Sequence, residues 1–153
     1  MRKAEKLAIK ASKAYRKHNK FLQRYYELVL RTIFACDYSG KVNFDPTAQL
    51  VHNGLGVVFH PKTVVGPNCK IYQNVTLGGN GKLIDGKKVN SGGPTLEKNV
   101  AVFSGACVLG PITIGHDSII GANAVVTHDV PPNSLVSGNP AIVKERKFDY
   151  DFS

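Results

Sequence analysis

A six-residue apolar period constrains the fold of this chain more than any other feature of its sequence. From Leu96 to Pro131 an aliphatic residue returns at every sixth position: Leu96, Val102, Val108, Ile114, Ile120 and Val126. The same register runs upstream through Phe59, Val65, Ile71 and Leu77. A fixed short period is the signature of a solenoid, because neither a helix nor an alternating strand keeps an apolar residue at every sixth place for so long.

The period predicts a three-sided coil, with about six residues on each side and about eighteen in each turn. The aliphatic residue of each block points inward and stacks on its counterparts in neighbouring turns, so several turns are needed for stability. The fold class is therefore mainly β, a parallel β-helix with a short N-terminal α-helical segment. Corners that need unusual backbone angles are expected at glycines such as Gly66, Gly110, Gly115 and Gly121.

Breaks in the register divide the chain into three parts: a basic helical segment (1–41), the coil (42–147) and a tail (148–153). Within the coil, the aliphatic ladder stops at Leu77 and resumes at Leu96, and residues 78–95 between them include six glycines. This segment is predicted to be a loop extruded from one corner. Insertions in solenoids often line the binding face.

The N-terminal segment is predicted to be helical over residues 3–35, with a break at residues 18–20. Residues 1–41 hold 11 Lys and Arg against 3 Asp and Glu, so +8 of the chain's net +9 lies there. Its apolar stripe, which includes Leu22, Tyr25, Val29 and Ile33, has two interpretations. It is either a membrane-surface helix, or a face that packs on the first coil or on a neighbouring subunit. We favour packing, because a polar break interrupts the stripe.

Composition limits the remaining possibilities. No stretch approaches the ~18 apolar residues of a membrane span, and the basic N-terminus lacks the apolar run of a signal peptide. Three cysteines give no disulfide framework, so we expect a reducing cytoplasm. The five histidines and the cysteines have no metal-ligand spacing, so no metal is expected.

Three local motifs point to a family. They are His52 followed by Gly56-Val57-Val58, the segment IYQNVTLGG at 71–79, and SGNPA at 137–141. Together they resemble the serine acetyltransferase branch of the hexapeptide-repeat acyltransferases, which includes O-acetyltransferases acting on sugars of surface polysaccharides. The resemblance implies a left-handed coil, a homotrimer with active sites between subunits, and acetyl-CoA as co-substrate. The acceptor would be a hydroxyl of a sugar or of L-serine.

The resemblance also implies a histidine general base, because an alcohol is a poor nucleophile unless a base takes its proton as it attacks the thioester. His52 matches that histidine, although it stands four residues before Gly56 where the family usually has three. Asn53 is the alternative at this place. His60 is a rival that we expect on the surface. The acidic partner of the base is assigned to Asp45, with Asn43 as the alternative.

Family matching further implies a site for acetyl-CoA along a groove between coils. Small residues would let the pantetheine lie close to the backbone, glycines after the ladder would admit the thioester or supply an N–H to the oxyanion, and cations near the C-terminus would meet the phosphates. The residues that match the groove along the pantetheine are Gly105, Ala122, Thr127 and His128. Gly78 and Gly79 match the glycines beside the thioester. Lys144 and Arg146 match the cations that would meet the phosphates, with Lys82, Lys87 and Lys88 as alternatives.

One departure from the family concerns the acceptor. Serine acetyltransferases have a further active-site histidine just before the proline that follows the glycine-rich loop, whereas this chain has Gly92-Gly93-Pro94. The departure favours a sugar over serine. The alternative function is a non-catalytic β-solenoid for assembly or scaffolding, since a fold does not fix a function.

Overall fold

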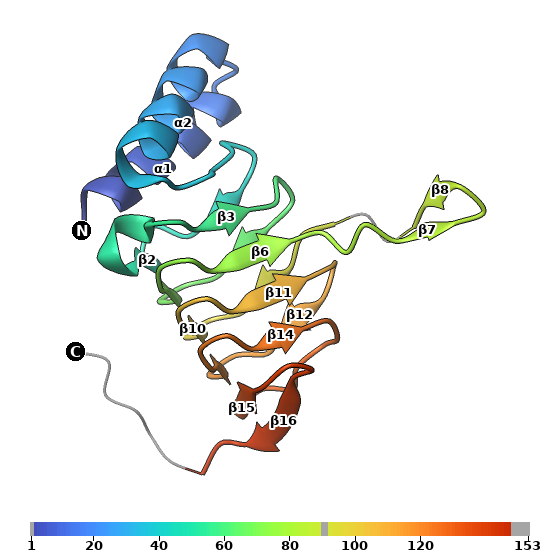
Figure 1. The fold of residues 1–153 in the computed structure, drawn as a ribbon. Coiled ribbons are helices and arrows are strands. Elements are labelled where there is room, and N and C mark those ends of the chain that lie inside the picture. The colour runs from blue at the N-terminus through green and yellow to red at the C-terminus, as the bar shows by residue number, and fades with distance from the viewer. Residues whose placement is uncertain (1, 90–91, 148–153) are drawn as a thin grey trace.

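A computed structural model describes residues 2–89 and 92–147 and shows two helices stacked on one end of a coil of short strands (Figure 1). The helices are α1 (Lys3–Arg16) and α2 (Lys20–Phe34). They confirm the predicted break, where Asn19 caps α2 by accepting from the Leu22 N–H at 3.0 Å. The predicted tail, residues 148–153, lies outside the described residues.

Three sheets form the three sides of the coil. Side A contains β3 (Val58–Phe59), β6 (Thr76–Gly78), β11 (Cys107–Leu109) and β14 (Val125–Val126). Side B contains β1 (Asn43–Phe44), β4 (Val64–Val65), β9 (Thr95–Leu96) and β12 (Thr113–Ile114). Side C contains β2 (Gln49–Leu50), β5 (Lys70–Ile71), β10 (Ala101–Val102), β13 (Ile119–Ile120), β15 (Ser134–Ser137) and β16 (Ile142–Glu145). A short 3-10 helix, η1 (Val51–Gly54), follows β2.

Neighbouring strands on each side pair in parallel, except that β16 pairs antiparallel with β15 at the end of side C. The chain runs from side C to side A to side B, so three edges separate the sides: the C–A edge, the A–B edge and the B–C edge. The predicted loop leaves from the A–B edge. It projects from the coil as a hairpin of β7 (Leu83–Ile84) and β8 (Lys87–Lys88) (Figure 1).

The predicted apolar ladder forms the core. Ile71 pairs with Val102 and Val102 with Ile120, so equivalent residues stack one coil apart. All three side chains are fully buried. Burying one such side chain contributes about 1.5–3 kcal/mol of transfer free energy, so the stack of coils is the main source of stability.

The corners are built differently from the prediction. Gly110 has a positive φ of 108°, but Gly66, Gly115 and Gly121 do not. Left-handed corners are instead filled by residues whose short polar side chains tolerate that conformation, namely Asn53, Asn68, Asn74, Asn99, Asp117, Asn123 and Asn133. Gly66 is needed for close approach, since a Cβ there would lie 2.8 Å from the Leu96 carbonyl oxygen.

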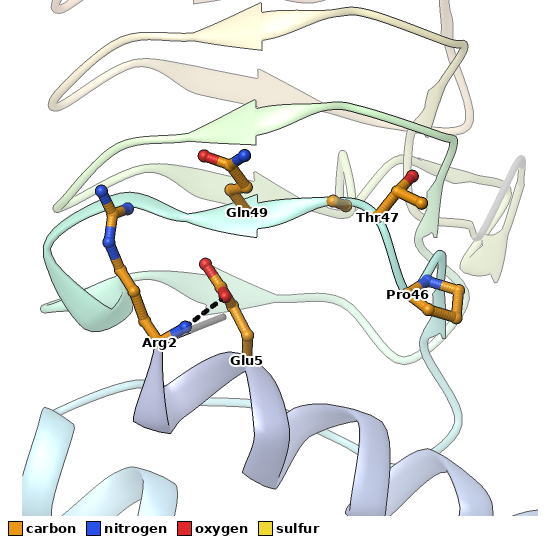
Figure 2. Close-up of a pocket in the computed structure, with 6 residues that line it drawn as sticks. Arg2, Glu5, Pro46, Thr47 and Gln49 are labelled. Atoms are coloured by element: carbon orange, nitrogen blue, oxygen red, sulfur yellow. Dashed lines mark hydrogen bonds between the residues drawn. The ribbon is translucent and has the colours of Figure 1, made fainter. Parts of the chain in front are cut away.

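α1 docks on the first coil through a face of small residues. Ala4, Ala8 and Ala11 are fully buried and belong to the same core as the coil. The buried Glu5 carboxylate accepts from the Leu50 N–H at 2.9 Å and from the Arg2 N–H at 2.6 Å. Figure 2 shows Glu5 and Arg2 beside the chain that leads into β2.

Of the two partners expected for the apolar stripe, the first coil is wrong, and packing on a neighbouring subunit stays a prediction. Leu22, Tyr25 and Ile33 of α2 are 39%, 53% and 68% exposed, whereas α2 packs on α1 and its Leu30 is fully buried. The alanine face of α1 leaves α2 in a second layer, one helix away from the coil.

Candidate active site

The predicted base lies on the C–A edge, in η1. His52 and Asn53 both have left-handed backbones, with φ of 55° and 57°, and Gly54 and Gly56 also have positive φ. Val51 and Gly54 anchor the turn by being buried, while the His52 side chain is exposed. Two consecutive positive φ values in non-glycine residues are costly, and such conformations gather at functional sites.

An aromatic stack continues from His52 down the same edge. The ring centroids of His52 and Tyr72 are 6.4 Å apart in an edge-on arrangement. Tyr72 stacks on Phe103 with centroids 4.6 Å apart and ring planes at 11°. The sequence patterns did not indicate these two aromatics as site residues, although each directly follows a ladder residue: Tyr72 follows Ile71, and Phe103 follows Val102 one coil later. The stack fixes a flat apolar wall next to the imidazole.

Two of the predicted acetyl-CoA residues share this edge. Gly105 lies on the turn after Phe103, and Ala122 is exposed one coil further on. A Cβ at Gly105 would lie 2.1 Å from Asn123 Oδ1, so the asparagine of the next coil already requires glycine there. Packing between coils therefore already explains the glycine at this position.

The other predicted acetyl-CoA residues of the coil lie on the A–B edge. Gly78 ends β6 and Gly79 begins the loop, while Thr127 and His128 are exposed just after β14. Thr127 Oγ1 and His128 Nδ1 form a hydrogen bond of 3.0 Å.

A cavity of about 210 Å³ opens at the A–B edge, beneath the loop. His60 is half-buried and lines it, so the expectation of a plain surface histidine is wrong. The Lys62 N–H donates to His60 Nδ1 at 3.1 Å, so the neutral ring has its hydrogen on Nε2. The other lining residues are Gly79, Asn80, Gly81, Lys82, Val89 and Gly92.

Gly93 lies against the same histidine. A Cβ at this position would lie 2.7 Å from Thr63 Oγ1 and 2.9 Å from His60 Nδ1. His60 and Thr63 thus occupy the space that a side chain before Pro94 would need. The packing is therefore tight at the position where the family has its further histidine.

The structure places Asp45 on the B–C edge, at the other end of side C from His52. Its Oδ1 accepts from the Thr47 N–H at 2.8 Å and from Thr47 Oγ1 at 2.6 Å. Among the described residues no contact joins Asp45 to His52. The assignment of Asp45 stays a prediction that no interaction within one chain supports.

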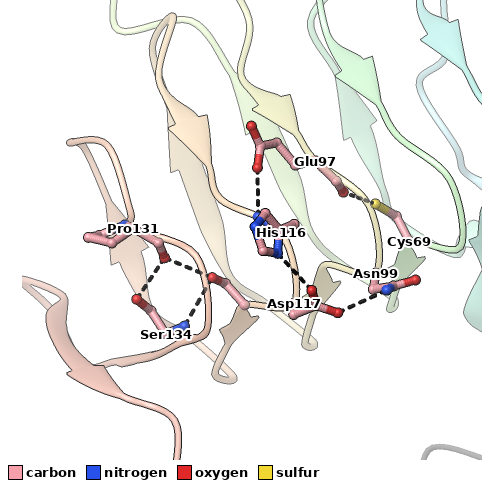
Figure 3. Close-up of polar contacts among 8 residues, drawn as sticks. Cys69, Glu97, Asn99, His116, Asp117, Pro131 and Ser134 are labelled. Atoms are coloured by element: carbon pink, nitrogen blue, oxygen red, sulfur yellow. Dashed lines mark hydrogen bonds and ion pairs between the residues drawn. The ribbon is translucent and has the colours of Figure 1, made fainter.

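Further along, the B–C edge has a polar network of its own (Figure 3). Asn99 Nδ2 donates to Asp117 Oδ1 at 2.8 Å, and His116 Nδ1 lies 2.7 Å from Asp117 Oδ2. The hydrogen bond from Asn99, and then that with His116, lowers the pKa of Asp117. The Cys69 thiol donates to the Glu97 carbonyl oxygen at 2.8 Å, and burial raises its pKa to about 11. These contacts join successive coils and leave no reactive thiolate at this edge.

Lys144 and Arg146 lie on and just after β16. Lys144 is exposed and pairs with Leu135, while the Arg146 N–H donates to the Asn133 carbonyl oxygen at 2.8 Å, on the B–C edge. The structure therefore does not bring Arg146 to Gly105 and Ala122. The roles of both cations stay predictions.

The predicted site is thus split between two edges of one chain. His52, Gly105 and Ala122 lie on the C–A edge, whereas Gly78, Gly79, Thr127 and His128 lie on the A–B edge. Side A separates them by about 15–20 Å, the span of five or six extended residues. Among the described residues, no hydrogen bond, ion pair or ring contact joins His52, Gly105 or Ala122 to Gly78, Gly79, Thr127 or His128.

Comparisons with known proteins find serine acetyltransferases both by sequence and by structure. A scan against protein-family models finds no match. The serine acetyltransferase of Synechococcus elongatus is 46% identical over 107 residues, which are 67% of this chain and 42% of that protein. The crystal structure of serine acetyltransferase from Vibrio cholerae superposes with a TM-score of 0.84 at 29% identity, over 95% of this chain and 54% of that one.

This chain belongs to the serine acetyltransferase-like branch of the hexapeptide-repeat family. The predicted fold class, a left-handed parallel β-helix with an N-terminal helical segment, is confirmed. A serine acetyltransferase from Brucella abortus, solved in complex with coenzyme A, matches with a TM-score of 0.82 and 30% identity, over 92% of this chain and 54% of that chain. The chain spans about half the length of the relatives it matches.

Proposed function

We propose that this chain is an acetyl-CoA-dependent O-acetyltransferase that transfers acetyl directly to an acceptor hydroxyl, with His52 as general base. Its relatives are serine acetyltransferases, and one that shares the fold was solved with coenzyme A. His52 is exposed on a conformationally costly turn, next to an aromatic wall where a thioester and an acceptor can be held.

The observation that supports this proposal best is the division of the predicted residues between two edges. One chain cannot assemble them, but three copies around an axis parallel to the coil can. Such a three-fold arrangement is closed and uses one repeated interface. It would place the C–A edge of one subunit against the A–B edge of the next, with His52 facing Gly79 and the loop.

The chemistry follows from that placement. His52 takes the proton of the acceptor hydroxyl as the oxygen attacks the thioester carbonyl carbon. The tetrahedral intermediate collapses with cleavage of the C–S bond, and the leaving sulfur takes the proton from His52, so coenzyme A departs as the free thiol and His52 returns to its neutral form. A backbone N–H at Gly78 or Gly79 of the next subunit would face the oxyanion. Holding both substrates in one cleft would supply much of the rate enhancement.

Acetyl-CoA would lie between the two edges. Gly105 and Ala122 would line one wall of the groove, and Thr127 and His128 of the next subunit the other. The exposed Ala122 and Thr127 are consistent with a ligand that passes close to the backbone.

The acceptor is proposed to be a sugar hydroxyl rather than L-serine. At the A–B edge the space before Pro94 is filled by His60 and Thr63, whose atoms leave no room for a side chain at Gly93. The cavity beneath the loop is lined by Lys82 and four glycine or asparagine residues, which suits a polar, hydroxyl-rich ligand. Serine remains the comparison substrate in the test.

The test is thiol release from acetyl-CoA by the full chain with L-serine and a panel of free and nucleotide-linked sugars. The proposal predicts release with at least one acceptor. In His52→Ala, kcat should fall by about 10²–10⁴-fold while acetyl-CoA affinity stays within about twofold, because the base acts on the acceptor and not on coenzyme A binding.

His60→Ala and Asn53→Ala serve as matched controls for the assignment. A larger loss of kcat in either of these than in His52→Ala would move the base away from His52. If the wild-type chain bound no acetyl-CoA, the enzyme proposal would be wrong and the non-catalytic solenoid would be favoured.

A further inference from the structure

The outward side of α2 is an apolar face that nothing in the described chain covers. We call it the outer α2 face and define it by Phe21, Leu22, Tyr25, Leu28 and Ile33. Phe21, Leu28 and Ile33 are 81%, 60% and 68% exposed. Positions 21, 25 and 28 follow the three- and four-residue steps of one helix side, where a groove of about 560 Å³ runs between Lys20, Phe21, Arg24, Tyr25 and Leu28. A contiguous exposed apolar patch of this kind marks an interaction site.

Cations line one border of this face. Lys20 and Arg24 line the groove itself, and Arg31 continues the row one turn after Leu28. Arg31 forms an ion pair with Asp37. These three cations are part of the net charge of +8 that residues 1–41 hold.

The acidic residue of α2, Glu27, lies beside the cationic row, where it shares neighbouring hollows with Arg24 and Arg31, but it does not line the apolar groove. Glu27 Oε1 accepts from the Gly40 N–H at 2.6 Å and from Gln23 Nε2 at 2.8 Å, on the side that faces the connection to the first strand. The groove is therefore lined by apolar and cationic side chains together. A partner with an anionic surface and an apolar interior would match both the cations and the apolar side chains of this groove.

We propose that the outer α2 face docks on the surface of an anionic lipid bilayer. Phe21, Tyr25 and Leu28 would enter the boundary between headgroups and acyl chains, while Lys20 and Arg24 meet lipid phosphates. The helix would lie in the plane of the membrane surface, since no helix of the described residues is long and apolar enough to span it. A second copy of the chain fits less well, because its cationic row would meet the same row of charges.

Membrane docking through α2 does not depend on the acetyltransferase reaction, but it would determine where in the cell that reaction takes place. Because the helices stack on one end of the coil (Figure 1), docking through α2 would hold the whole coil at the bilayer. Acceptors attached to lipids would then be within reach of the enzyme.

The test is flotation of the full chain with vesicles of pure phosphatidylcholine and with vesicles containing about a third phosphatidylglycerol, at low and high salt. We expect binding to the anionic vesicles that weakens as salt rises. The double variant Phe21→Ala/Leu28→Ala should lower the partition coefficient at least about tenfold, because both side chains lose their apolar contact. Lys20→Gln/Arg24→Gln should lower it about tenfold on anionic vesicles alone.

Leu83→Ala/Ile84→Ala is the matched control, since it removes two side chains of similar exposure from the loop hairpin. It should bind vesicles like the wild type. Equal binding to neutral and anionic vesicles, no vesicle binding at all, or an equal loss in the control would each overturn the proposal. So would a drop in oligomer mass for Phe21→Ala/Leu28→Ala in light scattering, which would assign the face to a second copy.

Discussion

Gly93 shows how one residue limits the chemistry of the A–B edge. A methyl group there would lie 2.7 Å from Thr63 Oγ1 and 2.9 Å from the Thr63 backbone N. Because backbone atoms cannot move aside cheaply, Gly93→Ala should lower the free energy of unfolding by about 1–3 kcal/mol, measured by urea denaturation.

Gly79→Ala is the control for this prediction. A Cβ at Gly79 would meet the Gly92 carbonyl oxygen and His60 at 3.5 Å, which is ordinary contact. Its unfolding free energy should stay within about 0.5 kcal/mol of the wild type. Equal losses in the two variants would mean that Gly93 is not tightly packed.

Asp117 adds stability that depends on pH. Its pKa is lowered in the folded chain, first by the hydrogen bond from Asn99 and then by that with His116. Its contribution is therefore present above the unfolded pKa near 3.9 and is lost as pH falls through the lower folded pKa. Asp117→Asn should unfold about 0.5–1 kcal/mol more easily at pH 7, and this difference should shrink as the pH falls below the unfolded pKa near 3.9.

Asp85→Asn is the reference for Asp117, because Asp85 also has a positive φ but is exposed on the loop hairpin. Urea midpoints of the two variants should differ at pH 7 and converge in acid. A gap that persists at low pH would show that packing, and not the charge of Asp117, explains the loss.

At the scale of single residues, the sequence identified individual candidate residues better than it identified the residues that contact them. It located His52 on the chain, but the stack of Tyr72 and Phe103 beside it depends on which residues the coil brings together. It predicted glycine at the corners, whereas asparagine occupies six of the eleven left-handed non-glycine positions among the described residues, because both residue types tolerate that backbone and no local pattern distinguishes them.

The attachment of α1 to the coil is the main feature at the scale of elements. Glu5 is 3% exposed, and its carboxylate satisfies the N–H groups of Leu50 and Arg2. Glu5→Ala leaves a buried donor without its partner, so the free energy of unfolding should fall by about 1–3 kcal/mol, followed by circular dichroism.

Two further variants sharpen this prediction. Glu5→Gln keeps one acceptor oxygen and should lose less than Glu5→Ala. Lys6→Ala changes an exposed neighbour and should stay within about 0.5 kcal/mol of the wild type. If Glu5→Ala unfolded like Lys6→Ala, the carboxylate would not hold the helix on the coil.

The two helices also show what periodicity can predict. The break at residues 18–20 followed from polar residues in an apolar pattern, and it is confirmed. Which stripe faces the coil did not follow, because alanines at 4, 8 and 11 have a weak hydrophobic signal yet allow closer packing than the large residues of α2. Close approach depends on shape as well as on hydrophobicity.

At the scale of the whole molecule, the six-residue period predicted the coil and the position of its loop, because each turn repeats one stacking interaction. The division of the site between edges could not be predicted in this way. It follows from how the eighteen residues of a turn distribute over three sides, and it becomes a functional statement only with an assembly of several chains.

Complementation between two inactive variants tests the shared site most directly. His52→Ala alters the C–A edge, and Gly79→Phe fills the space beside His60 on the A–B edge. Each variant alone should lack acetyl transfer. In trimers mixed at random from equal amounts, about one quarter of the interfaces would join an intact C–A edge to an intact A–B edge. The account therefore predicts recovery of about a quarter of the wild-type activity, and mixed trimers no more active than either variant alone would contradict it.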